Sequence, residues 1–183
     1  MMLHIIHLLH RNDRWQLLQN ELATQKITNF RVWPGILDEE IPFRGVAKAH
    51  KQIVLYAKEN NLPSILVAED DVKFTAPGAM SYFLEQEPLL YDLYLGGISH
   101  GKIGNDQTVT DFAGTMLYKI NQYFYDTFLS IPEDGHIDRN LKNKGRYIVC
   151  QPFVATQHNG YSDNKKEYFN YDLCLNGRTL FGH

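Results

Sequence analysis

The sequence has few cysteines, no cluster of basic residues and no long apolar segment. Its two cysteines, Cys150 and Cys174, lack the CxxC spacing of a zinc knuckle and are too few for a disulfide framework. The formal net charge is −3 and no basic run occurs, which argues against nucleic-acid binding because phosphates require clustered Lys and Arg. The apolar segment 3–9 is too short to cross a bilayer and lacks the flanks of a signal peptide. We therefore expect a cytoplasmic protein with no transmembrane segment, and peripheral attachment to the inner face of a membrane stays open.

Apolar runs and helical periods alternate along the first two-thirds of the chain. The segment 64–68 is apolar without alternation, which is typical of a strand covered on both faces. The alternation predicts one α/β domain spanning 1–183, with a Rossmann-like, mostly parallel central sheet and helices on both faces. The segment 98–111 is predicted to be a polar loop. The patterns predict strands near 3–9, 30–33, 64–68, 91–95, 115–119 and 146–150, and helices near 14–25, 45–60, 77–87, 121–129 and 137–143.

Three adjacent carboxylates, Glu69, Asp70 and Asp71, follow the predicted strand 64–68. Ligands of such sheets bind at the carboxyl ends of the strands. Adjacent carboxylates repel one another at neutral pH, and Mg²⁺ or Mn²⁺ would neutralise them. In an extended segment Glu69 and Asp71 point to one side and Asp70 to the other. A solvated acidic loop explains the same residues, because turns favour Asp, so the spacing alone leaves both interpretations open.

Four other residues are candidates for the same site, each with a structural alternative. Arg11 and Arg14 follow the first predicted strand and could bind a diphosphate or remain an exposed pair beside a helix start. His50 lies on the apolar stripe of the helix 45–60, which favours a core histidine that reaches the site only indirectly. Asp138 begins a short predicted helix and could be a general base or a carboxylate that stabilises the helix start.

Two polar or glycine-bearing segments complete the set of candidates. Gly96 and Gly97 end a predicted strand and permit close approach to the backbone, although a glycine pair alone is weak evidence. His158 and Asp163 lie in the polar cluster 157–163, which could complete a metal shell or form a surface loop. The sequence contains no Walker loop and no G-x-G-x-x-G motif.

The order of these pieces resembles glycosyltransferase family 25, the lipooligosaccharide-type sugar transferases with a GT-A fold. Two positions depart from the family pattern, because His7 stands for an Asn and Ala49 for the Ser before His50. The resemblance rests on an Arg-bearing turn after the first strand (6–14), a strand ending in Glu-Asp-Asp (65–71), a strand ending in Leu-Gly (93–96), a Gly-x-x-x-Tyr strand (114–118), Ile137-Asp138, and Pro152, Gln157, Ser162 and Asp163.

This resemblance implies a metal-dependent glycosyltransferase of lipopolysaccharide biosynthesis that uses a nucleotide-sugar donor and a glycan or lipid-linked acceptor. It implies that Asp71 binds Mn²⁺ or Mg²⁺, that Glu69 and Asp70 support metal and nucleotide, and that Arg11 and Arg14 lie near the nucleotide. Asp138 becomes the base that deprotonates the acceptor hydroxyl, and the segment 98–111 a mobile loop near the donor. The alternatives are a nucleotidyltransferase of similar fold and a non-catalytic domain that binds a sugar or a partner.

Overall fold

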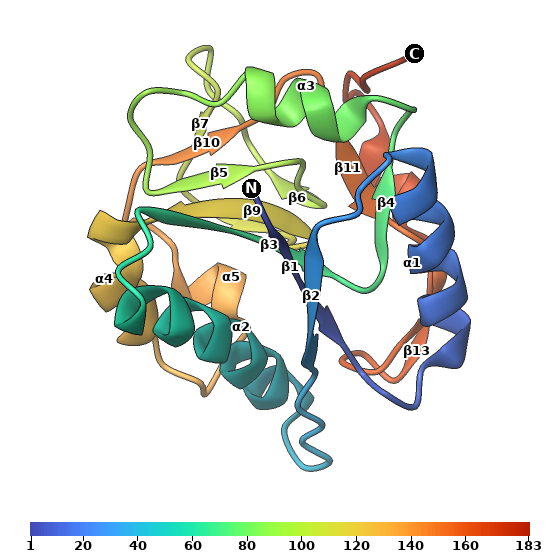
Figure 1. Cartoon of the computed structure of the whole chain (residues 1–183), viewed down its shortest axis with the longest axis vertical. Coiled ribbons are helices and arrows are strands. Elements are labelled where there is room, and N and C mark those ends of the chain that lie inside the picture. Colours follow the sequence, from blue (N-terminus) through green and yellow to red (C-terminus); the bar gives the residue numbers. More distant parts are fainter.

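A seven-stranded sheet forms the centre of the computed structural model, which describes residues 1–183 (Figure 1). The strand order is β2-β1-β3-β9-β5-β10-β7. Strands β9 and β7 run antiparallel to their neighbours, and the other strands share one direction. The predicted α/β class with a mostly parallel sheet is confirmed. The strands are β1 (Leu3–His7), β2 (Phe30–Pro34), β3 (Ser64–Glu69), β5 (Leu93–Leu95), β7 (Thr108–Val109), β9 (Leu117–Asn121) and β10 (Tyr147–Val149).

Helices cover both faces of this sheet and bury a separate apolar cluster on each (Figure 1). Helices α2 (Pro42–Glu59), α4 (Tyr125–Leu129) and α5 (Ile137–Asn140) lie on one face, and α1 (Asn12–Thr24) and α3 (Ala79–Glu85) on the other. In strand β3, Ile65 and Val67 contribute to the first cluster, whereas Leu66 and Ala68 contribute to the second. Since successive side chains of a strand point to opposite faces, the unbroken apolar run of β3 is explained.

Helix α2 begins earlier than its apolar stripe predicts. The helix was predicted to begin near residue 45, but Pro42 occupies its first turn, where the fixed φ of proline is favourable and its missing N–H costs nothing. A Cβ at Gly45 would lie 2.2 Å from the carbonyl oxygen of Ile36, so the preceding segment folds directly onto the helix.

The expected polar loop at 98–111 is anchored to the rest of the molecule. Strand β6 (His100–Gly101) pairs with β8 (Phe112–Ala113), and β7 adds to the edge of the main sheet next to β10. Ile98 and Val109 are buried in the first apolar cluster. The segment is thus a largely polar loop as predicted, but it also contains two short strands that the sequence pattern did not indicate.

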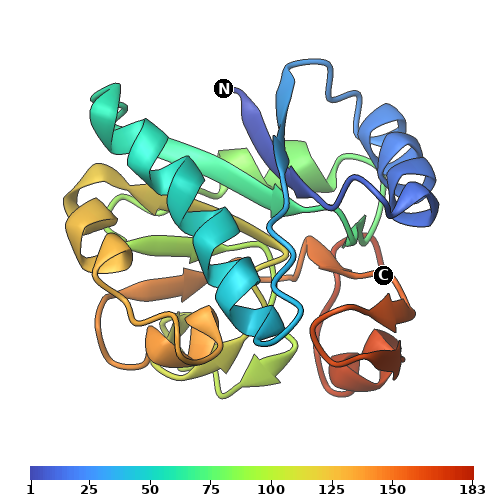
Figure 2. The same ribbon diagram turned by 90° about the horizontal axis from the view of Figure 1, so that it is seen from below.

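The chain after β10 returns to the end of the sheet where β3 stops (Figure 2). Strand β11 (Ala155–Gln157) pairs with β4 (Val72–Phe74), which follows the acidic triplet directly. A hairpin of β12 (Gly160–Ser162) and β13 (Glu167–Phe169) comes next, followed by a short 3₁₀ helix, η2 (Tyr171–Leu175). Another 3₁₀ turn, η1 (Gln122–Phe124), precedes α4.

None of the helices combines the length and apolarity needed to cross a membrane.

Candidate functional site

A cavity of about 440 Å³ opens at the carboxyl end of strand β3. Its wall includes Arg14 of α1, Glu69 and Asp71 of the triplet, Asp138 of α5, and Asp163 after the β12 strand. These residues are far apart in the sequence and come together because the parallel strands end at this edge of the sheet. The size and the convergent charged groups suit a small polar ligand.

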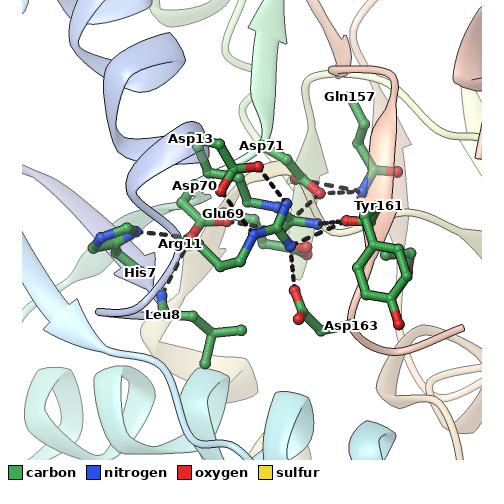
Figure 3. Close-up of polar contacts among 12 residues, drawn as sticks. His7, Leu8, Arg11, Asp13, Glu69, Asp70, Asp71, Gln157, Tyr161 and Asp163 are labelled. Carbon is green, nitrogen blue, oxygen red and sulfur yellow. Dashed lines mark hydrogen bonds and ion pairs between the residues drawn. The ribbon is translucent and has the colours of Figure 1, made fainter. Parts of the chain in front are cut away.

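Asp70 points away from the cavity and ties the triplet to the first strand and helix. One of its oxygens bonds to Nδ1 of His7 at 2.8 Å and accepts from the N–H of Leu8 at 3.2 Å (Figure 3). The other oxygen accepts from Arg14 at 2.8 Å. Burial opposes the charge of Asp70, yet His7 and Arg14 hold its pKa below the ordinary value. Asp70 is therefore a buried, charged anchor.

Glu69 lies between the cavity and the buried histidine of helix α2. Its Oε1 accepts a 2.6 Å hydrogen bond from Thr115 and lies 3.4 Å from Nε2 of His50. The other ring nitrogen of His50 bonds to the hydroxyl of Tyr118 at 2.9 Å. Burial works against the charged carboxylate, but His50, Thr115 and Arg14 keep the pKa of Glu69 below its ordinary value. His50 itself is fully buried and reaches the cavity only through Glu69.

Asp71 is the carboxylate whose charge is least compensated. Its oxygens lie 3.2 Å from Arg14 and 3.3 and 3.4 Å from the side-chain amide of Gln157. Burial raises its pKa to about 7, and the charges of Glu69 and Asp70 act in the same direction against that of Arg14. A cation beside Asp71 would favour its charged form.

The two arginines of the predicted pair have different surroundings. Arg14 faces the cavity, bridges two carboxylates of the triplet and donates to the carbonyl of Tyr161 at 3.1 Å. Arg11 lies outside the cavity wall, and its guanidinium is bound by Asp13, by Asp163 and by the carbonyl of Tyr161 (Figure 3). Arg14 thus lines the cavity while it holds the triplet, whereas Arg11 fastens α1 to the hairpin segment.

The side chains present could share a divalent cation with a ligand but could not enclose it alone. No group of three or more His, Cys, Asp or Glu side chains converges on one point. The ring of His158 pairs with Glu21 at 3.0 Å, and Asp163 is engaged by Arg11. Asp71 remains, a buried carboxylate on the cavity wall with only long contacts. This fits Mg²⁺ or Mn²⁺, which commonly bind one or two carboxylates together with the phosphates of a substrate.

Asp138 lies on the same cavity wall as Glu69 and Asp71, although it is far from them in the sequence. One of its oxygens accepts from the backbone N–H of Gly114 and the other from that of Arg139, both at 2.8 Å. These two bonds fix the orientation of the carboxylate and leave further lone pairs free. Such a group can accept a proton from a bound hydroxyl.

The predicted glycine pair lies outside the cavity wall and serves strand association. A Cβ at Gly97 would lie 2.2 Å from the carbonyl oxygen of Ala155, and one at Gly96 would lie 2.7 Å from the side chain of Leu117. The carbonyl of Gly96 accepts from the N–H groups of Val154 and Ala155. The backbone does approach closely here, but its partner is β11.

Three groups that shape the site were given no role from the sequence. Thr115 holds Glu69, Gln157 contacts Asp71, and the carbonyl of Tyr161 accepts from both arginines. A backbone carbonyl leaves no trace in a sequence. The ordered family motifs include Gln157, so that resemblance could have marked it, while no pattern distinguishes Thr115 from any other strand residue.

The fold resembles those of several solved structures at low sequence identity. A glycosyltransferase involved in the glycosylation of the major capsid of PBCV-1 matches with a TM-score of 0.54 and 12% identity, over 94% of this chain and 97% of its own. HddC from Yersinia pseudotuberculosis, in complex with GMP-PN, matches with 0.52 and 13%, over 81% and 89%. A197 from STIV matches with 0.51 and 12%, over 100% and 95%.

The chain therefore shares its fold with a glycosyltransferase and with two other proteins, at a sequence identity that shows the fold alone. By sequence, the chain matches no protein-family profile and no curated protein.

Proposed function

We propose that the protein is a glycosyltransferase that moves a sugar from a nucleotide-sugar donor to a glycan or lipid-linked acceptor with the help of a divalent cation. The observation that carries the proposal is the cavity at the end of β3, which joins a cationic group, Arg14, an undercompensated carboxylate, Asp71, and a separately oriented carboxylate, Asp138. The glycosyltransferase-like fold supports the same class. The ordered motifs that resemble glycosyltransferase family 25 support that family as the finer assignment.

In this proposal the diphosphate of the donor binds at the Arg14 end of the cavity. Arg14 supplies a fixed positive charge in a partly buried setting, with its side chain 16% exposed, where charge-assisted bonds to phosphate are strong. Asp71 would hold the cation, which would stabilise the charge that develops on the leaving diphosphate. Glu69, which contacts Thr115 and His50, fixes the part of the cavity wall next to Asp71.

Asp138 is the residue proposed to accept the proton of the acceptor hydroxyl. Its carboxylate is oriented by two backbone N–H groups before any substrate arrives. Fixing a base in advance reduces the entropy cost of reaching the reactive geometry.

A nucleotidyltransferase is the second candidate, because the HddC structure of similar fold contains a nucleotide analogue. That reaction requires basic groups for a triphosphate. Arg11 is occupied by Asp13 and Asp163, so of the predicted pair only Arg14 is open to the ligand. Arg14 is the one basic side chain that the first half of the chain contributes to the wall, which also contains Arg139 and Lys165. The products of turnover separate the two reactions.

Thermal unfolding with a panel of nucleotide-sugars, with and without Mn²⁺, tests the proposal. A donor present at 100 times its dissociation constant stabilises the fold by about 2.7 kcal/mol, which is roughly 5–10 °C for a chain of this size. We expect such a shift with one donor, dependent on Mn²⁺ and abolished by EDTA.

The matched pair of variants is Asp71→Asn, which should lose the shift, and Asp126→Asn on helix α4, outside the cavity wall, which should keep it. Absence of a shift with every nucleotide-sugar would exclude the donor assignment. A shift without turnover would favour the non-catalytic binding domain.

A further inference from the structure

A second cavity, of about 500 Å³, lies beside the proposed donor cavity. The two cavities share Ser99, His100 and Cys174 in their walls, so they are neighbours with a common border. The second one is formed by strand β6, the end of η2 and the turn that follows. Its lining consists of Ser99, His100, Gly101, Lys102, Cys174, Asn176, Gly177 and Arg178.

The charge of the second cavity is opposite to that of the protein as a whole. The chain carries a net charge of −3, yet the lining contains Lys102 and Arg178 and no Asp or Glu. The donor cavity, in contrast, has four carboxylates in its wall, together with the basic side chains of Arg14, Arg139 and Lys165. A lining whose charged residues are both basic attracts an anion. Because almost none of the lining residues is apolar, the ligand is expected to be polar.

Neither basic side chain is neutralised by a carboxylate. Lys102 is exposed and forms no ion pair. Arg178 donates to the carbonyl of Gly101 at 2.6 Å and lies over the ring of Phe153 at 5.5 Å. These contacts hold the guanidinium in position and leave its charge free for a ligand.

The border between the cavities leads directly to the proposed base. The backbone N–H and the hydroxyl of Ser99 both donate to the carbonyl of Ala113, at 2.8 and 3.0 Å. The next residue, Gly114, donates its N–H to Asp138. A sugar whose charged group lies in the second cavity could therefore present a hydroxyl across Ser99 to Asp138.

We propose that the second cavity is the acceptor subsite and that it selects a sugar bearing an acidic group, either a phosphate or a carboxylate. This assignment rests on the proposed function, because it takes Asp138 as the base and the neighbouring cavity as the donor site. The volume is within the range that holds a small ligand. Lys102 and Arg178 bind the acidic group, and the border at Ser99 sets its distance from Asp138.

Direct binding of glucose 6-phosphate, glucuronate and glucose, measured by calorimetry on the full chain, tests the proposal. We expect at least one of the two anionic sugars to bind at least tenfold more tightly than glucose, a difference of 1.4 kcal/mol or more, and its binding to weaken as salt is raised. The comparison of the two anionic sugars tells whether phosphate or carboxylate is preferred.

The variant Lys102→Glu reverses the charge of an exposed side chain and should weaken binding of the preferred anionic sugar at least tenfold. Lys144→Glu, an exposed lysine outside both walls, should leave the affinity unchanged. The donor-induced melting shift should be the same in both variants as in the unaltered protein. Equal affinity for glucose and for both anionic sugars, or no effect of Lys102→Glu, would overturn the subsite.

The donor titration separates this proposal from the proposed function. If no nucleotide-sugar binds but an anionic sugar still binds through Lys102, the transferase assignment fails, and with it the role of this cavity as an acceptor subsite. If donors bind and anionic sugars do not, the transferase assignment stands and the acidic acceptor is wrong.

Discussion

Replacing Arg14 with Met should destabilise the protein strongly and in a pH-dependent way. The guanidinium lies 2.8 Å from Asp70 and 3.2 Å from Asp71, whose side chains are 5% and 6% exposed. Removing one partner of a buried ion pair typically costs about 3–5 kcal/mol, because a buried charge is left uncompensated. We expect a loss of this size at pH 8.

The dependence on pH follows from Asp71. Its pKa is already raised to about 7 by burial, against the opposing charge of Arg14. Without Arg14 that pKa rises further, so Asp71 can escape the unfavourable charge by protonation at low pH but not at high pH. The difference between Arg14→Met and the unaltered protein should therefore shrink as the pH falls through 7, by at most about 1.4 kcal/mol per unit. The loss of stability that remains at pH 5.5 measures the cost of leaving Asp70 without Arg14.

Urea unfolding at pH 5.5 and 8, followed by circular dichroism, gives both quantities. The double variant Arg14→Met/Asp71→Asn removes one of the two carboxylates left without their arginine partner. It should recover part of the stability lost at pH 8. Arg146→Met, at an exposed arginine, is the matched control and should leave the unfolding curve unchanged. A loss below about 1 kcal/mol, a loss equal at both pH values, or no recovery in the double variant would refute the role given to Arg14.

Three further variants test other parts of the structure. Asp138→Asn should lower kcat by about 10²–10⁴-fold with the donor-induced melting shift intact, and loss of that shift would argue against a role as base. Gly97→Ala should cost about 1–3 kcal/mol in urea unfolding, because its Cβ would lie 2.2 Å from the carbonyl of Ala155, whereas Gly160→Ala meets nothing within 4 Å and should be neutral. His4 accepts from Trp33 at 2.9 Å, and burial and Arg31 lower its pKa to about 4. The stability gained by keeping it neutral is present above pH 6.5 and is lost as the pH falls toward 4. In His4→Asn the stability should fall less between pH 6.5 and pH 4. An unchanged dependence of stability on pH in this range would contradict the assignment.

The sheet was largely readable from the sequence because its signals are local. The unbroken apolar run of β3 predicts a strand buried on both faces, and Ile65 to Ala68 do divide between two apolar clusters. The apolar stripe of α2 predicts a helix against the sheet. The two strands within 98–111 were missed, because β6 and β7 have only two residues each, too few to show a period.

The site was only partly readable, because the contacts that define it join distant parts of the chain. The pattern of β3 places Asp70 on the side opposite to Glu69 and Asp71, as the structure has it. Nothing local indicates that Arg14 bridges two of these carboxylates while Arg11 is held by Asp163. The ring of His158 is equally ambiguous in the sequence, since only the position of Glu21 on α1 decides where it points.

The reaction products distinguish a glycosyltransferase from a nucleotidyltransferase and from a non-catalytic domain. The protein is incubated with Mn²⁺ and either a panel of nucleotide-sugars and acceptor sugars, or nucleoside triphosphates and a sugar 1-phosphate. We expect release of a nucleoside diphosphate together with a glycosylated acceptor in the first mixture, lost in Asp71→Asn. Release of pyrophosphate in the second mixture, or no turnover in either, would contradict the proposed glycosyltransferase function.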